Sequence, residues 1–314
     1  MEQFEKGLVS IIIPVFNREA LFSETLDSIQ KQTYGEWECI IVDDGSTDSS
    51  LSVAKKYEIN DNRFRVYSRP WYKKKGANSC RNHGFSKISG EFVQWFDSDD
   101  IMLPTMIEEK IHKINSDKYD IVVARLGFFK NKIDEFYTDD RINIESNSNN
   151  LPFDFFAGNY WFQTSQPLFK KSFLSSQKKL FNTSLNRNQE TELFVRLLIK
   201  NPKIVYTNNV LILQRVHENS IGGKYGSSSE SKKYLIDLPA YKLLFVSFLN
   251  TPFLSEEVLV YFKKYFNSCL TKMNFQFKSM LNLLLFGFKH KLFKSNILAI
   301  KIFFSRFLST IKNV

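Results

Sequence analysis

Short apolar runs alternate with helical spacing through the first hundred residues, and this alternation constrains the fold more than any other feature. The apolar runs at 8–13, 37–44, 63–68 and 91–96 predict buried strands. Residues 19–32, about 47–57 and 77–88, which separate those runs, have helical spacing. This order predicts an α/β fold, with a mostly parallel sheet flanked by helices in a Rossmann-like arrangement.

Polar residues follow three of the predicted strands, at Pro14–Asn17, Asp43–Ser46 and Asp97–Asp100. Open α/β sheets bind ligands at the carboxyl ends of their strands. The sequence therefore predicts a ligand site at one edge of the sheet.

Three carboxylates, Asp97, Asp99 and Asp100, lie within four positions directly after a predicted buried strand. Like charges this close repel each other, and Mg²⁺ or Mn²⁺ would cancel that repulsion through oxygen ligands. The alternative is a solvated acidic turn, with Asp100 capping the next helix. The position after a buried strand favours a cation site, in which Asp100 would hold backbone N–H groups.

The C-terminal part of the chain differs from the rest in its charge and in its spacing of apolar residues. Residues 1–230 contain 30 basic and 30 acidic side chains, so residues 231–314 carry the whole net charge of +10. Phe, Leu and Lys recur there at helical spacing, which predicts three or four amphipathic helices. We therefore expect a catalytic domain at 1–230 and a basic helical region at 231–314. That region would bind a membrane surface, or else pack as a helical bundle.

The N-terminus has no signal-peptide pattern, and no apolar run is long enough to span a membrane. We expect a cytoplasmic protein, peripheral on the inner face of the cell membrane. Nothing matches a nucleic-acid-binding module, and a homo-oligomer is left open.

Four segments, VSIIIPVFNRE, IIVDDGSTDSS, GANSCRNHGFSKISGEFVQWFDSDD and NQETELFVRLL, together resemble family 2 glycosyltransferases with the GT-A fold. The resemblance covers residues 8–217. It implies an inverting enzyme of hexosyltransferase type that transfers a sugar from a nucleotide-diphosphate donor, with a UDP-sugar favoured, to a glycan or lipid-linked acceptor. It also implies a divalent metal, Mn²⁺ or Mg²⁺, and a role in making surface polysaccharides.

The resemblance also implies which residues form the site. Asp97 and Asp99 would form a DXD motif, in which Asp99 binds the metal directly and Asp97 contacts either the donor ribose or the metal's water shell. His217, in the segment Arg215–His217, would be a further metal ligand. The nucleotide-sugar contacts would be Pro14, Val15, Phe16, Asn17, Asp43, Arg81, Asp97 and Ser98.

The resemblance places the catalytic base in the segment Asn188–Leu198. Many relatives have a Glu-Asp pair there, which becomes Gln189–Glu190 in this chain, so the role falls on Glu190. Glu192, on the same predicted turn, is the main competitor. Acidic residues are also favoured at any helix N-terminus, whatever the function.

Two other functions remain open from the sequence. A nucleotidyltransferase would use the same carboxylates and cation without Glu190. A non-catalytic scaffold at the membrane would bind the nucleotide sugar and transfer nothing. The chain lacks the glycine-rich motifs of dehydrogenases and P-loop kinases.

Overall fold

The computed structural model describes residues 4–115, 119–130, 132–139, 144–146, 148–177, 180–185, 187–216, 230–249, 251–272, 283, 285, 286, 289 and 290. The chain forms two compact units. The first comprises Met1–Ser184 and Lys200–His217, and the second comprises Leu185–Ile199 and Glu218–Val314. The helix after Asn188 thus groups with the C-terminal helices, whereas the sequence had placed it in the catalytic domain.

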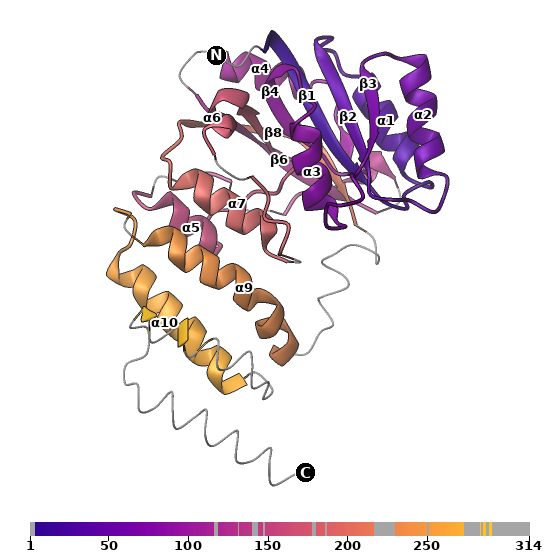
Figure 1. The fold of residues 1–314 in the computed structure, drawn as a ribbon. Helices are drawn as coiled ribbons and strands as arrows, with labels where there is room; N and C mark the ends of the chain where they lie inside the picture. Colours follow the sequence, from indigo (N-terminus) through magenta and orange to yellow (C-terminus); the bar gives the residue numbers. More distant parts are fainter. Residues whose placement is uncertain are drawn as a thin grey trace, which may run out of the picture. The chain divides into compact units, whose positions relative to one another are not determined.

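The first unit is built on one eight-stranded sheet of order β3-β2-β1-β4-β7-β6-β8-β5 (Figure 1). Its strands are β1 (Glu5–Val15), β2 (Trp37–Asp43), β3 (Phe64–Ser68), β4 (Gly90–Trp95), β5 (Ile101–Met102), β6 (Ile121–Phe129), β7 (Pro167–Lys170) and β8 (Ile204–Arg215). Strands β1 to β4 are parallel, and β6 and β8 run in the same direction as β4. The expected mostly parallel sheet is therefore confirmed.

Strands β5 and β7 are short, and both run antiparallel to their neighbours. Strand β5 has two residues and β7 has four, so neither is long enough to show a periodicity. Strand β7 pairs with β4 on one side and β6 on the other. It therefore continues the sheet from the first hundred residues into the later ones.

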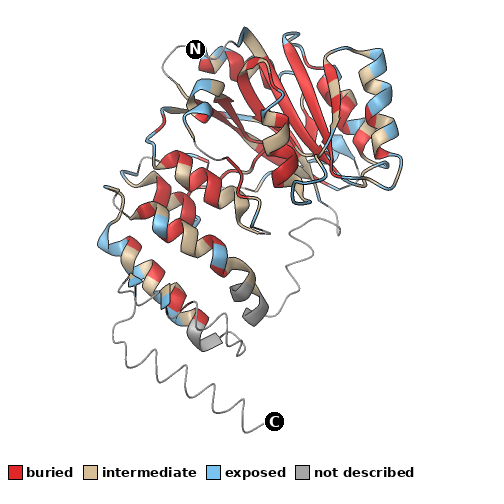
Figure 2. Cartoon of the chain, in the orientation of Figure 1, coloured by how far each residue is buried: buried red, intermediate tan, exposed pale blue. Residues whose placement is uncertain are grey.

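Helices flank this sheet in the first unit. They are α1 (Phe22–Gln30), α2 (Ser50–Asn60), α3 (Ala77–Phe85), α4 (Met106–Ile114), α5 (Leu151–Ala157) and α6 (Lys171–Ser175), with a 3₁₀ turn η1 at Ile133–Glu135. The sheet strands are largely buried, while α2 exposes one side (Figure 2). A Cβ on Gly84 would lie 2.4 Å from Ile12 Cγ2, so only glycine lets α3 approach β1 this closely. That approach fixes Arg81, one turn earlier on α3, close to the strand ends.

The second unit contains α7 (Gln189–Leu198), α9 (Glu230–Phe248) and α10 (Glu256–Lys272). Helix α9 packs against both α7 and α10 (Figure 1). The rings of Phe245 and Phe262 meet edge to face at 5.1 Å, and Phe262 and Phe266 are fully buried. Phe262 and Phe266 lie in the region that the sequence predicts either to bind a membrane or to pack as a helical bundle. In the structure both side chains pack between helices. Among the described residues, no helix is both long and apolar enough to cross a bilayer.

Candidate functional site

The ends of β1, β2 and β4 meet at one edge of the sheet. In the parallel register Val15 lies opposite Asp43, and the Asp44 N–H donates to the Val15 carbonyl at 2.9 Å. The Phe96 N–H donates to the Ile12 carbonyl at 3.0 Å, which continues the pairing beyond β4. The segments at 14–17, 43–46 and 97–100 thus come together, because neighbouring parallel strands end on the same side.

The loop after β1 is fastened to the loop after β2 through Asn17. Its backbone is in the left-handed region with φ 49°, which asparagine tolerates better than most residues. The Asn17 N–H donates to Ser46 Oγ at 3.1 Å, and Asn17 Oδ1 accepts from the Thr47 N–H at 2.9 Å. Pro14 and Val15 are buried before this turn, and Phe16 is 38% exposed. The predicted nucleoside loop therefore has a defined shape and presents one aromatic ring.

Asp43 is buried at the end of β2 and stabilises its own turn. Its carboxylate accepts from the Gly45 N–H at 2.9 Å and from the Ser46 N–H at 3.1 Å. A carboxylate offers about four acceptor positions, so these contacts orient the group and leave acceptor positions for a ligand. Asp43 can therefore still accept a hydrogen bond from a ligand.

Asp97, which follows β4, forms an ion pair with Arg81 of α3. Arg81 Nη2 donates to Asp97 Oδ1 at 2.7 Å. The arginine side chain is 5% exposed and the aspartate side chain 30% exposed. The ring of Phe181 lies 5.2 Å from the guanidinium carbon and limits its movement. The arginine is thus a buried cation whose anionic partner lies at the surface.

Asp99 and Asp100 face different partners. Arg18 Nε donates to Asp99 Oδ2 at 3.0 Å, with both side chains partly exposed. Asp100 is 2% exposed and accepts from the backbone N–H of Arg215 at 3.1 Å, which matches its predicted structural role. Burial, and then the nearby carboxylates Asp97 and Asp99, raise the pKa of Asp100 well above its usual value. Ser98, between the two partly exposed carboxylates, is buried.

Three arginines that the sequence analysis did not single out supply the positive charge of this edge. Arg18 pairs with Asp99, and Arg69 Nε pairs with Asp44. Arg215 Nε donates to the Asp99 carbonyl at 3.2 Å, and its Nη2 pairs with Glu24 at 2.7 Å. The sequence signal that could have pointed to these arginines is the crowding of carboxylates at the strand ends, because closely spaced negative charges are stabilised by nearby cations.

The donor set at this edge fits a divalent cation. Asp97 and Asp99 provide hard oxygen ligands; Asp97 accepts from Arg81 through Oδ1, and Asp99 accepts from Arg18 through Oδ2. Within the described ranges, no three His, Cys, Asp or Glu side chains are placed so that together they could hold a metal ion. Mg²⁺ commonly takes one or two protein carboxylates and completes its shell with substrate phosphates and water. The two aspartates therefore suit a cation shared with a diphosphate, and His217, the third predicted ligand, lies outside the described residues.

Glu190 belongs to the second unit, in the first turn of α7, where it is half-buried. Glu192, its competitor, is 4% exposed. Both Glu192 oxygens accept from Arg196, at 2.6 and 3.0 Å. The carboxylate of Glu192 is therefore committed to an ion pair on its own helix.

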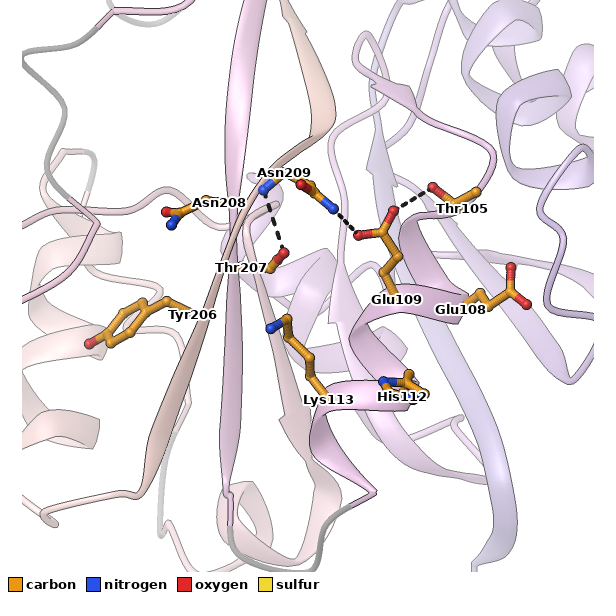
Figure 3. A pocket seen from close by; sticks show the side chains of 9 residues that line it. All are labelled: Thr105, Glu108, Glu109, His112, Lys113, Tyr206, Thr207, Asn208 and Asn209. Atoms are coloured by element: carbon orange, nitrogen blue, oxygen red, sulfur yellow. Dashed lines mark hydrogen bonds between the residues drawn. The ribbon is translucent and has the colours of Figure 1, made fainter.

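The first unit also has a groove of about 570 Å³ between α4 and β8. Figure 3 shows its side chains: Thr105, Glu108, Glu109, His112, Lys113, Tyr206, Thr207, Asn208 and Asn209. Glu109 accepts from Thr105 Oγ1 at 2.8 Å and from Asn209 Nδ2 at 2.6 Å (Figure 3). None of the predicted site residues lines this groove.

Comparison with solved structures identifies the fold. Staphylococcus aureus TarS, residues 1–349, in complex with UDP aligns with a TM-score of 0.60 and 18% identity, over 84% of this chain and 72% of that one. TarS in complex with UDP-GlcNAc aligns with a TM-score of 0.65 and 18% identity, over 89% of this chain and 79% of that one. At these identities the likeness concerns the fold, which is the GT-A fold.

Sequence comparison identifies the family. Residues 10–183 match Glycosyl transferase family 2. Glycosyltransferase GlyG of Streptococcus pneumoniae is 30% identical over 68% of this chain and 72% of that protein. The GalNAc(5)-diNAcBac-PP-undecaprenol beta-1,3-glucosyltransferase of Campylobacter jejuni is 27% identical over 75% of this chain and 74% of that protein. The chain therefore belongs to glycosyl transferase family 2 and is a glycosyltransferase with the GT-A fold.

Proposed function

We propose that this protein transfers a sugar from a UDP-sugar to a hydroxyl group of a lipid-linked glycan, with inversion at the anomeric carbon and with a divalent cation. The convergence of the ends of β1, β2 and β4 carries the proposal, because it brings to one edge the segments that the family resemblance assigns to the nucleoside, the phosphates and the cation. The names of relatives support the substrate classes. UDP and UDP-GlcNAc are bound to TarS, and the C. jejuni relative is named for an undecaprenol-linked acceptor.

Donor binding would use the groups already oriented at this edge. The loop Pro14–Asn17 would contact the nucleoside, with Phe16 offering an apolar face. Asp43, held by its turn, would accept the imide N–H of uracil. Arg81 would hold Asp97 in place beside the ribose and diphosphate. A cation on Asp97 and Asp99, with His217 as a further ligand, would neutralise charge on the departing diphosphate.

Transfer itself needs a base for the acceptor hydroxyl. As the acceptor oxygen bonds to the anomeric carbon, the bond from that carbon to the phosphate oxygen breaks, and UDP leaves. Glu190 would take the hydroxyl proton. The assignment rests on the match of Glu190 to the family's base position, whereas Glu192 pairs with Arg196 through both carboxylate oxygens. The basic second unit would help to hold the enzyme at the membrane that carries the acceptor.

The test compares Glu190→Gln with the wild type in three measurements: UDP affinity, sugar transfer to extracted lipid-linked glycans, and the anomeric configuration of the product. We expect unchanged UDP affinity and loss of transfer by about 10²–10⁴-fold, the usual contribution of a general base. Wild-type product with retained configuration, or transfer that persists in Glu190→Gln, would contradict the mechanism. Release of pyrophosphate in place of UDP would indicate a nucleotidyltransferase.

The metal is tested separately. Removing divalent ions with EDTA should abolish transfer, and adding Mn²⁺ or Mg²⁺ should restore it. Isothermal titration of Mn²⁺ should show binding in the wild type that Asp99→Asn weakens. Full transfer in EDTA would refute the requirement for a cation.

A further inference from the structure

The connection from β3 to α3 contains a tight turn with exposed aromatic side chains. The Lys73 N–H donates to the Pro70 carbonyl at 2.9 Å, which closes a four-residue turn. Trp71 and Tyr72 occupy its two central positions and are 90% and 66% exposed. Their rings meet edge to face at 5.9 Å. Exposing two large aromatic side chains at adjacent positions is unusual for a surface that meets only water.

Arg69 stabilises this turn through contacts with its backbone and with the end of β2. Its Nε pairs with Asp44, its Nη1 donates to the carbonyls of Pro70 and Lys73, and its own N–H donates to the Asp43 carbonyl at 2.8 Å. The turn is thus fixed to the end of β2 by an arginine whose side chain is 13% exposed. Trp71 and Tyr72 are therefore presented by a preorganised backbone, which lowers the entropy cost of binding.

The charges of the turn complement an anionic surface. Lys73, Lys74 and Lys75 follow the aromatic pair, and all three are exposed. The Nζ of Lys73 lies 5.4 Å from the Tyr72 ring centroid. No carboxylate occurs between Arg69 and Gly76. Trp and Tyr favour the headgroup level of a bilayer, and lysines beside them add attraction to anionic lipid.

Other exposed apolar side chains rise from the same edge of the sheet. Phe16 follows β1, Phe136 and Tyr137 follow β6, and Val216 follows β8, each between 38% and 50% exposed. Strands β1, β3, β6 and β8 all run in one direction, so their carboxyl ends share this edge. Among the described residues of the first unit, most of the large exposed hydrophobic side chains therefore gather at the edge that carries the candidate site.

We propose that the turn Pro70–Lys75 inserts Trp71 and Tyr72 into the interface of an anionic bilayer, so that the site-bearing edge of the first unit faces the membrane. This turn belongs to the first unit, whereas the basic C-terminal helices belong to the second. The inference extends the proposed function, because a lipid-linked acceptor would then meet the enzyme at the edge where the donor binds.

Tryptophan fluorescence of the full-length chain tests the insertion directly. The protein has four tryptophans; Trp37 and Trp95 are buried and Trp161 is half-buried, which leaves Trp71 as the exposed reporter. With vesicles of phosphatidylcholine and phosphatidylglycerol, we expect emission to shift to the blue and brominated lipids to quench it. Both signals should disappear in Trp71→Phe, which keeps an aromatic ring at the position. Quenching that is absent while the protein still sediments with vesicles would overturn the proposal, because the C-terminal helices alone would then bind.

Vesicle sedimentation measures the contribution of the turn. The variant Trp71→Ala/Tyr72→Ala should lose about a hundredfold in partitioning, from the burial of two aromatic side chains at the lower end of their usual contribution. Lys73→Gln/Lys74→Gln should lose about fivefold per lysine on anionic vesicles and little on phosphatidylcholine alone. Matched controls on α2 are Ile59→Ala, 81% exposed in the wild type, and Lys56→Gln. Equal losses in the controls would contradict a specific role for the turn.

UDP affinity, measured on the same variants, separates this proposal from the proposed function. If Trp71→Ala/Tyr72→Ala weakens UDP binding and leaves vesicle binding intact, the turn belongs to the donor site and the membrane proposal fails. If the wild type binds no UDP but Trp71 is quenched by brominated lipid, the proposed function fails and the membrane inference stands.

Discussion

Replacing Asp97 by asparagine should destabilise the fold as well as abolish activity, whereas the same change at Asp99 should mainly affect activity. The difference comes from the arginines. The side chain of Arg81 is 5% exposed, so without Asp97 its charge remains in a poorly solvated place. Arg18, the partner of Asp99, is 29% exposed and can be solvated by water.

The magnitude follows from this contrast. Removing one partner of a buried ion pair costs about 3–5 kcal/mol. Asp97 itself is 30% exposed, and the amide oxygen of asparagine still accepts a hydrogen bond, so we expect a smaller loss of about 2 kcal/mol. That corresponds to a fall in Tm of about 4–8 °C for a domain of this size. For Asp99→Asn we expect about 0.5 kcal/mol, the usual value for a more exposed pair.

Circular dichroism melts of the two variants measure the difference. The double variant Asp97→Asn/Arg81→Met provides the control, because removing the stranded cation should restore most of the lost Tm. Equal Tm shifts in the two single variants would refute the reasoning. So would a double variant less stable than Asp97→Asn alone, because Arg81 would then be stabilising without its partner.

Three further predictions concern single side chains. Burial lowers the pKa of Lys110 well below its usual 10.5. The unfolded chain therefore binds the extra proton between the lowered pKa and 10.5, so stability rises with pH there. In urea titrations, the stability of Lys110→Met relative to wild type should fall by up to about 1.4 kcal/mol per pH unit across that window. A constant difference would contradict this. A Cβ on Gly90 would lie 2.5 Å from the backbone oxygen of Leu8, so Gly90→Ala should cost about 1–3 kcal/mol in the same titrations, and an unchanged midpoint would refute the clash. Arg18→Gln should bind Mn²⁺ about twofold more tightly in calorimetry without nucleotide, because the ion pair with Asp99, worth about 0.5 kcal/mol, no longer competes; unchanged affinity would show that Asp99 does not hold the cation.

The sequence alone determined the first four parallel strands and the edge of the sheet at which the polar segments of the candidate site meet. Apolar runs such as Leu8–Ile13 are buried on both faces, so their hydrophobicity is continuous and easily recognised. Each run stops where the chain turns polar, and parallel neighbours must end on the same side. The segments that contain Asn17, Asp43 and Asp97 could therefore be assigned to one edge without a structure.

The tertiary structure decided what the sequence left open, because pairings between distant residues have no local signature. Strand β7 was too short to recognise, yet it joins β4 to β6. The pairing of Arg18 with Asp99 joins residues 81 positions apart. Folding also pairs Glu192 with Arg196. It buries Phe262 and Phe266, although the sequence pattern does not distinguish them from the other phenylalanines of the C-terminal region. Periodicity and local composition fix which segments are strands and where they end, whereas the choice of each charge's partner depends on contacts that form only when the chain is folded.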